Sequence, residues 1–162
     1  PGTEDGTDIG PMINPAAIEK IRAHVADALD RGAARATRTR DLAGQYADPV
    51  VLSGATDEMR LASEETFGPV APIFRFETEE EALALANGTP FGLAAYFYTR
   101  DMSRAFRFGE ALEFGMVGLN TGLLSNEVSP FGGVKASGLG REGSQEGIEE
   151  YLETKAMHFG GL

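Results

Sequence analysis

The feature that most constrains the fold is an alternation of strand and helix patterns between residues 70 and 120. Apolar runs at 70–76, 93–99 and 116–120 predict three strands, and the more polar segments between them carry helix signals. Strands joined by helical crossovers of this length run in parallel and connect right-handedly. The pattern therefore predicts an α/β fold built on a three-layer parallel sheet, in which these three strands lie side by side and the crossover helices cover its faces.

Capping residues mark three helix starts. Asn14 followed by Pro15 predicts a helix early in the chain, because asparagine caps a helix and proline suits its first position. Thr78 with Glu81 three residues later forms a capping box, and Asp101 is suited to cap the next helix. The last two signals place one helix on either side of the central predicted strand.

Beyond residue 120 the chain becomes a long glycine-rich loop, followed by a predicted short helix at 144–152 and a final strand at 154–159. Residues 138–143 match the spacing G-x-G-x-x-G, which binds dinucleotide phosphates when it directly follows a strand. Residues 132–137 have no hydrophobic strand pattern, so we reject a dinucleotide-binding turn here. We interpret these glycines as positions that permit positive φ and tight bends.

The charge and the cysteine content exclude several kinds of partner and site. The formal net charge is −11 and lysine and arginine form no cluster, so we expect no nucleic-acid partner. No apolar run is long enough to span a bilayer and no leader follows Pro1, so we expect no membrane partner and no secretion; an opening without methionine suggests a chain cut from a longer one. With no cysteine, and with His24 and His158 far apart, we expect no thiol nucleophile, no metal site and a cytoplasmic location.

Three motifs carry a family resemblance. Residues 64–69 (Glu-Glu-Thr-Phe-Gly-Pro), 87–94 (Asn-Gly-Thr-Pro-Phe-Gly-Leu-Ala) and 129–143 (Ser-Pro-Phe-Gly-Gly-Val-Lys-Ala-Ser-Gly-Leu-Gly-Arg-Glu-Gly) resemble aldehyde dehydrogenases in order and spacing. Residues 120–130 and 151–157 are similar to the succinate-semialdehyde dehydrogenase type within that family. The resemblance covers nearly the whole chain.

The resemblance implies the C-terminal part of an aldehyde-dehydrogenase catalytic domain. Residues 1–152 correspond to part of that domain, and residues 153–162 to an oligomerisation strand that pairs with a second subunit of a homo-oligomer. In the family, an upstream Rossmann domain holds NAD or NADP, and an upstream cysteine thiolate attacks the aldehyde. The resemblance therefore implies that this chain is inactive alone and holds no cofactor by itself.

The resemblance also assigns roles to individual residues. It matches Glu65 to the ligand of the cofactor ribose and Phe67 to an aromatic that packs near the nicotinamide. It matches Ser125 to the hydrogen-bond donor for the distal carboxylate of a semialdehyde, Phe131 to a wall of the substrate tunnel and Glu142 to a proton relay. Without the resemblance, the glutamates are solvated acids or halves of ion pairs, the serine forms a turn, and the aromatic residues are packing residues.

Two functions remain open at this point. The first is a part of an NAD(P)-dependent semialdehyde dehydrogenase whose activity belongs to the intact enzyme. The second is a freestanding, non-catalytic assembly or regulatory module that pairs with other subunits through its last strand. The residues also leave open the choice between NAD and NADP, and between succinate and glutarate semialdehyde, which differ by a methylene worth only about 1–3 kcal/mol.

Overall fold

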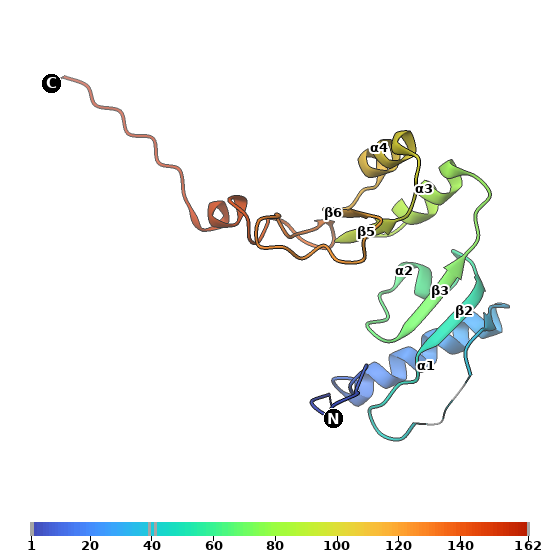
Figure 1. Ribbon diagram of the computed structural model, residues 1–162. Coiled ribbons are helices and arrows are strands. Elements are labelled where there is room, and N and C mark those ends of the chain that lie inside the picture. The colour runs from blue at the N-terminus through green and yellow to red at the C-terminus, as the bar shows by residue number, and fades with distance from the viewer. Residues whose placement is uncertain (1, 39, 41, 162) are drawn as a thin grey trace. The chain divides into compact units, whose positions relative to one another are not determined.

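The computed structural model describes residues 2–38, 40 and 42–161. The chain divides into two compact units, Pro1–Leu85 and Ala86–Leu162 (Figure 1). Among the described residues, the first unit has one three-stranded sheet and the second has two two-stranded sheets, and helix α3 (Glu79–Asn87) crosses the boundary between the units. Within the described ranges, no helix combines the length and the apolar character needed to cross a membrane.

The first unit begins with helix α1 (Pro15–Asp30), which confirms the predicted helix start. The side chain of Asn14 accepts a hydrogen bond from the backbone N–H of Ala17 at 2.9 Å, and Pro15 occupies the first helical turn, where its missing N–H costs nothing. After the helix, Gly32 adopts a φ of +98°, a left-handed conformation typical of helix ends.

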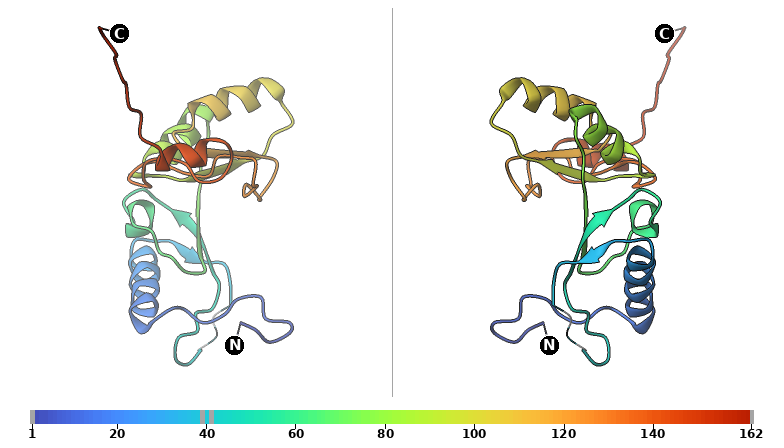
Figure 2. Two further views of the ribbon diagram at one scale, coloured as in Figure 1. Left: turned by 90° about the vertical axis from the view of Figure 1, so that its left-hand side faces the viewer. Right: turned by 90° about the vertical axis from the view of Figure 1, so that its right-hand side faces the viewer.

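A three-stranded sheet packs beside α1, as Figures 1 and 2 show. Strand β1 (Ala34–Arg35) runs antiparallel to β2 (Val50–Ala55), and β2 runs parallel to β3 (Val70–Phe74). Helix α2 (Arg60–Ser63) lies between β2 and β3 in the sequence. The core between α1, the sheet and the start of α2 consists of apolar side chains, which are Ile21, Val25, Ala28, Ala33, Val50, Leu52, Ala55 and Met59.

The second unit contains the predicted strand–helix–strand unit. Strand β5 (Ala94–Phe97) pairs in parallel with β6 (Met116–Leu119), and helix α4 (Met102–Ala111) connects them (Figure 1). The Asp101 side chain caps α4 by accepting from the backbone N–H of its third residue at 3.0 Å. A second, antiparallel ladder joins β4 (Phe91–Gly92) to β7 (Val134–Lys135), both only two residues long.

The sheet differs from the predicted three-stranded arrangement. Strand β3 pairs with β2 in the first unit, whereas β5 pairs with β6 in the second. No ladder joins β3 to β5 or β6 among the residues that the structure describes. The sequence pattern identified the strands and the parallel connection of β5 with β6, but it omitted β2 as a partner for β3, because pairing between strands is a non-local property.

The C-terminal segment also differs from the expectation. The predicted short helix at 144–152 is present as a 3-10 helix, η1 (Glu146–Tyr151). Residues 152–161 then continue without helix or strand (Figure 1), although a strand was expected at 154–159. A strand requires a neighbouring strand to satisfy its backbone groups, and no described part of this chain supplies one. The pairing of this segment with another subunit therefore stays a prediction.

Candidate functional site

Residues 64–69, the first of the three motifs, connect α2 to β3 in the first unit. Glu64 has extended backbone angles (φ −110°, ψ 130°), and the side chain of Glu65 is exposed. Phe67 has a φ of +48°, which bulky residues rarely adopt, and it is 78% exposed. Phe67 is therefore not a core aromatic of this chain. Strained backbone beside an exposed carboxylate and an exposed ring makes this segment a candidate binding element.

Two groups fix the Glu64 carboxylate at the start of the motif. The Arg60 guanidinium donates from Nε and Nη2 to the two carboxylate oxygens, both at 3.0 Å. The Nε2 atom of His24 lies 3.1 Å from Oε2 of the same carboxylate. The hydrogen bonds from Arg60 first, and from His24 second, lower the pKa of Glu64 to about 2, so this group is ionised at neutral pH.

His24 is the residue that the reasoning from sequence missed. Its ring is fully buried, and its Nδ1 atom lies 2.9 Å from Oγ1 of Thr66. A signal for this burial was present in the sequence, because position 24 follows Ile21 by three residues and precedes Ala28 by four, which places it on the apolar face of the helix.

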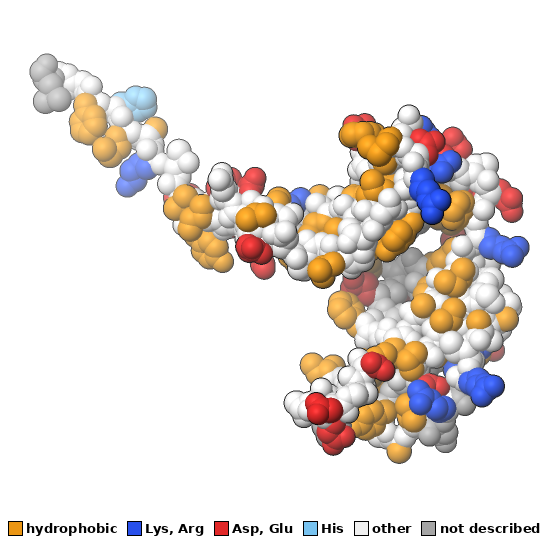
Figure 3. Space-filling view, in the orientation of Figure 1, with side chains coloured by type: hydrophobic (Ala, Val, Ile, Leu, Met, Phe, Trp, Pro, Cys, Tyr) orange, Lys and Arg blue, Asp and Glu red, His pale blue; other side chains and the backbone are white. Residues whose placement is uncertain are grey.

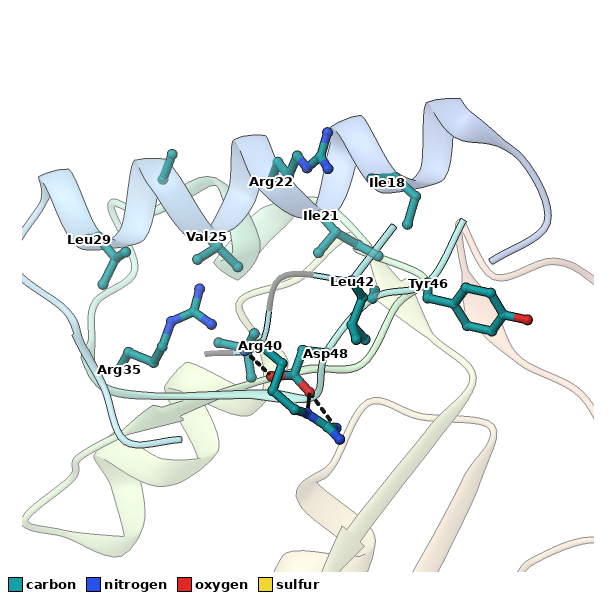
Figure 4. A pocket seen from close by; sticks show the side chains of 13 residues that line it. Ile18, Ile21, Arg22, Val25, Leu29, Arg35, Arg40, Leu42, Tyr46 and Asp48 are labelled. Carbon is teal, nitrogen blue, oxygen red and sulfur yellow. Dashed lines mark hydrogen bonds and ion pairs between the residues drawn. The ribbon is translucent and has the colours of Figure 1, made fainter. Parts of the chain in front are cut away.

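A hollow of about 400 Å³ lies beneath α1. Figure 4 shows Val25 and Leu29 of the helix on one side of it and Arg40 with Asp48 on another. The Arg40 guanidinium donates from Nε and Nη2 to Oδ1 of Asp48 at 2.9 and 2.6 Å, and these hydrogen bonds hold the pKa of the Asp48 carboxyl below its ordinary value. The lining of the hollow beneath α1 includes no residue to which the resemblance assigns a role, so this hollow has no part in the proposed chemistry.

In the second unit, the other two motifs meet. Strand β4 belongs to the motif at 87–94 and strand β7 to the motif at 129–143, so their ladder joins the two. Lys135 reinforces this junction, because its Nζ donates to the backbone carbonyl of Asn87 at 2.9 Å and pairs with Oε2 of Glu113 at 2.7 Å. Two sequence segments about 45 residues apart are thus held as one element.

The glycine-rich loop folds back on itself within the third motif. Phe131 and Glu142 form an antiparallel bridge, with backbone N–H groups donating in both directions at 2.8 and 2.7 Å. Arg141 does not form an ion pair with its neighbour Glu142; its Nη1 donates to the backbone carbonyls of Gly133 and Gly140 at 2.8 and 2.7 Å. The bridge places the Phe131 and Glu142 side chains at neighbouring positions.

The glycines of the G-x-G-x-x-G match serve this loop geometry. Gly138, Gly140 and Gly143 have φ values of +121°, +77° and +65°, all in the region that favours glycine. No strand immediately precedes them, because β7 ends at residue 135. The interpretation of these glycines as bends is therefore confirmed.

The bridge and the preceding loop border a shallow, open hollow of about 380 Å³. Three of the predicted site residues line it together, namely Ser125, Phe131 and Glu142. Its remaining lining is Asn126, Glu127, Ser129 and Gly143. The hollow offers hydroxyl groups, an aromatic ring and two carboxylates, which suits a small polar ligand. No cationic side chain lines it, so a charged partner for an anionic ligand has to come from outside this lining.

The five predicted site residues therefore fall into two groups. Ser125, Phe131 and Glu142 share the hollow in the second unit, whereas Glu65 and Phe67 lie in the motif of the first unit. The described residues contain no group of three or more histidine and carboxylate side chains that is able to hold a metal ion.

Comparison with known proteins gives this arrangement a context. The profile of the aldehyde dehydrogenase family matches residues 1–157 of the 162. The chain belongs to the aldehyde dehydrogenase family.

Relatives of this aldehyde dehydrogenase chain act on semialdehydes, according to their names. The chain is 55% identical to the glutarate-semialdehyde dehydrogenase of Pseudomonas putida (strain KT2440), over 96% of this chain and 32% of that protein. It is 53% identical to the NADP(+) succinate-semialdehyde dehydrogenase of Escherichia coli (strain K12), over 98% of this chain and 33% of that protein. The crystal structure of an aldehyde dehydrogenase from Brucella melitensis biovar abortus 2308 matches with a TM-score of 0.91 at 63% identity, and the match covers 95% of this chain and 32% of that one. The chain thus spans about a third of the length of these aldehyde dehydrogenases.

Proposed function

We propose that this chain forms part of the catalytic domain of an NAD(P)-dependent semialdehyde dehydrogenase, which oxidises succinate semialdehyde to succinate in the whole protein. The observation that carries the proposal is the shared hollow of Ser125, Phe131 and Glu142. The semialdehyde substrates in the names of two relatives support the same reading.

Each of the three residues in the hollow has a different role toward the substrate. The Ser125 hydroxyl donates a hydrogen bond to the distal carboxylate, and the Phe131 ring packs against the methylene chain. Glu142 accepts or relays a proton during release of the acid product. Because Glu127 and Glu142 both line the hollow, the substrate carboxylate also needs a positive charge from another part of the whole protein.

The first-unit motif fits the cofactor. An exposed carboxylate such as Glu65 accepts hydrogen bonds from both hydroxyls of a ribose, and an exposed aromatic such as Phe67, two residues on, offers a flat face to a planar ring. NAD or NADP, when bound, supplies the hydride acceptor. The part of Glu65 and Phe67 is to hold the sugar and the ring in place.

The nucleophile has to lie outside these residues. The chain contains no cysteine, and its hydroxyl groups are poorer nucleophiles and poorer leaving groups than a thiolate at neutral pH. We therefore infer that the chain forms walls of the site, that it holds no cofactor alone, and that it has no activity without the remainder of the enzyme.

A second candidate function is a non-catalytic assembly module. It is favoured by the segment after η1, in which Leu152, Met157 and Phe159 are between 64% and 76% exposed. Figure 3 shows apolar side chains spaced along this segment. Such a segment is suited to pair with the sheet edge of another copy, and residues 153–162 would then be the oligomerisation strand of a homo-oligomer.

Steady-state kinetics of the full-length protein test the proposed function. We expect NAD or NADP to be reduced with succinate semialdehyde, at a kcat/KM well above that for a neutral aldehyde of equal length. A full-length protein that forms oligomers and oxidises neither aldehyde would support the assembly module instead.

A further inference from the structure

His24 is the only buried polar or charged residue in the part of the chain that the structure describes. Its two ring nitrogens contact the two residues that flank Glu65. Nε2 lies 3.1 Å from Oε2 of Glu64, and Nδ1 lies 2.9 Å from Oγ1 of Thr66. The motif residues are 40 and 42 positions away in sequence, so these contacts attach α1 directly to the candidate cofactor-binding segment.

The hydrogen-bond chemistry of this contact is well defined. The ionised carboxylate of Glu64 only accepts hydrogen bonds, so the proton on Nε2 of His24 has to point toward it. The Thr66 hydroxyl both donates and accepts, and it satisfies Nδ1 in either state of the ring. The buried ring is therefore satisfied at both nitrogens, and its orientation is fixed by two directional contacts.

The contact also determines where Glu65 points. In an extended backbone, alternate side chains leave opposite sides. Glu64 and Thr66 both contact His24, and Glu65 between them is exposed, so we infer that the Glu65 side chain turns away from α1. The end of the motif also packs closely against α1 at Gly68. A Cβ atom at this position would lie 2.4 Å from Cδ1 of Ile21.

We propose that His24 is a positioning residue for cofactor binding, which holds the Glu65 carboxylate in the orientation that receives the ribose. This proposal rests on the proposed function, in which Glu65 binds the cofactor. Packing alone does not require a histidine at this buried position, since an apolar side chain fills such a site at lower desolvation cost. The polar ring is instead suited to fix the two neighbours of a binding residue.

A double-mutant cycle in the full-length enzyme tests the proposal, with the dissociation constants of NAD and NADP measured by calorimetry. We expect His24→Leu to raise the dissociation constant of the preferred cofactor about tenfold, because the two residues that flank Glu65 lose the contacts that hold them. In a Glu65→Ala background we expect the same substitution to change the constant less than about twofold, because the group that His24 orients is then missing.

Val25→Ala is the matched control. Val25 is buried on the same face of α1, so its truncation weakens the packing of the unit without touching the contacts of His24. We expect it to lower the unfolding midpoint in urea while leaving the cofactor dissociation constant unchanged. An increase equal to that of His24→Leu would show that general loss of packing explains the effect, and it would overturn the proposal.

The remaining outcomes separate this proposal from the proposed function. If Glu65→Ala weakens cofactor binding and His24→Leu does not, or if His24→Leu weakens it equally in both backgrounds, the positioning role is wrong and the role of Glu65 stands. If Glu65→Ala has no effect, both roles are wrong.

Should His24→Leu fail to fold, Thr66→Val takes its place in the cycle. Thr66→Ser, which keeps the hydroxyl, should then bind the cofactor like the parent enzyme, and equal weakening by both substitutions would overturn the proposal.

Discussion

The proposed substrate contact of Ser125 leads to a specific kinetic prediction. Its hydroxyl is exposed at the hollow and makes no hydrogen bond to another described residue. Ser125→Ala therefore breaks no side-chain hydrogen bond among the described residues, so we expect the loss in the full-length enzyme to reflect the contact with the substrate. A hydrogen bond to a charged group contributes about 1.5–3 kcal/mol, which corresponds to a decrease of roughly 10- to 150-fold in kcat/KM for succinate semialdehyde.

The assay compares two aldehydes. A neutral aliphatic aldehyde of the same length lacks the distal carboxylate, so its kcat/KM should change less than about threefold in the same variant. Ser129→Ala is the matched control, because Ser129 lines the same hollow and has no assigned role. Equal losses on the charged and the neutral aldehyde, or an equal loss in Ser129→Ala, would refute the contact between Ser125 and the carboxylate.

Four further predictions concern stability, each measured by urea unfolding. Asn14→Ala removes the side-chain cap of α1 and should lower the unfolding free energy by about 1 kcal/mol; no change would mean that the cap is not formed. Gly109→Ala, within α4 and with open space around the added methyl, should raise it by about 0.5–1 kcal/mol. Gly115→Ala should prevent correct folding or lower stability by more than about 2 kcal/mol, because the new Cβ would lie 2.0 Å from the backbone oxygen of Gly132; equal effects at the two glycines would contradict this. The pKa of Glu64 is lowered from 4.5 to about 2, so its contribution to stability is complete above pH 4.5 and is lost as the pH falls toward 2; Glu64→Gln should make stability less dependent on pH in that window, and an unchanged dependence would contradict the lowered pKa.

Local signals predicted helices α1, α3 and α4, but not the short helix α2. The caps at Asn14 and Asp101 each depend on one side chain and a backbone N–H within three residues, so they are readable without knowledge of the fold. The parallel pairing of 94–97 with 116–119 was also predictable, because a single helical crossover joins the two strands.

Non-local contacts were not predictable in the same way. The pairing of β3 with β2 and the two-residue ladder of β4 with β7 depend on which segments meet, and a short strand carries too little pattern to specify a partner. The two contacts of His24 join residues about 40 positions apart. Helical periodicity offered a signal, not used in the sequence reasoning, that this residue is buried, but it does not indicate which groups satisfy the ring.

The candidate site was predicted from family resemblance more than from physical pattern. Nothing in the spacing of Ser125, Phe131 and Glu142 indicated that they share a hollow. The bridge brings Phe131 and Glu142 together, and the chain between them bends at the glycines that follow residue 137. The extended tail is a different case, because its expected pairing requires a second chain.

The central claim is that these residues form walls around a substrate and a cofactor while the thiolate that attacks the aldehyde lies elsewhere in the whole protein. The most direct measurement is NAD(P)H formation from succinate semialdehyde by residues 1–162 purified alone, beside the full-length protein at equal concentration. We predict turnover by the full-length protein and none by the 162-residue chain. Reduction of either cofactor by the chain alone would contradict the claim.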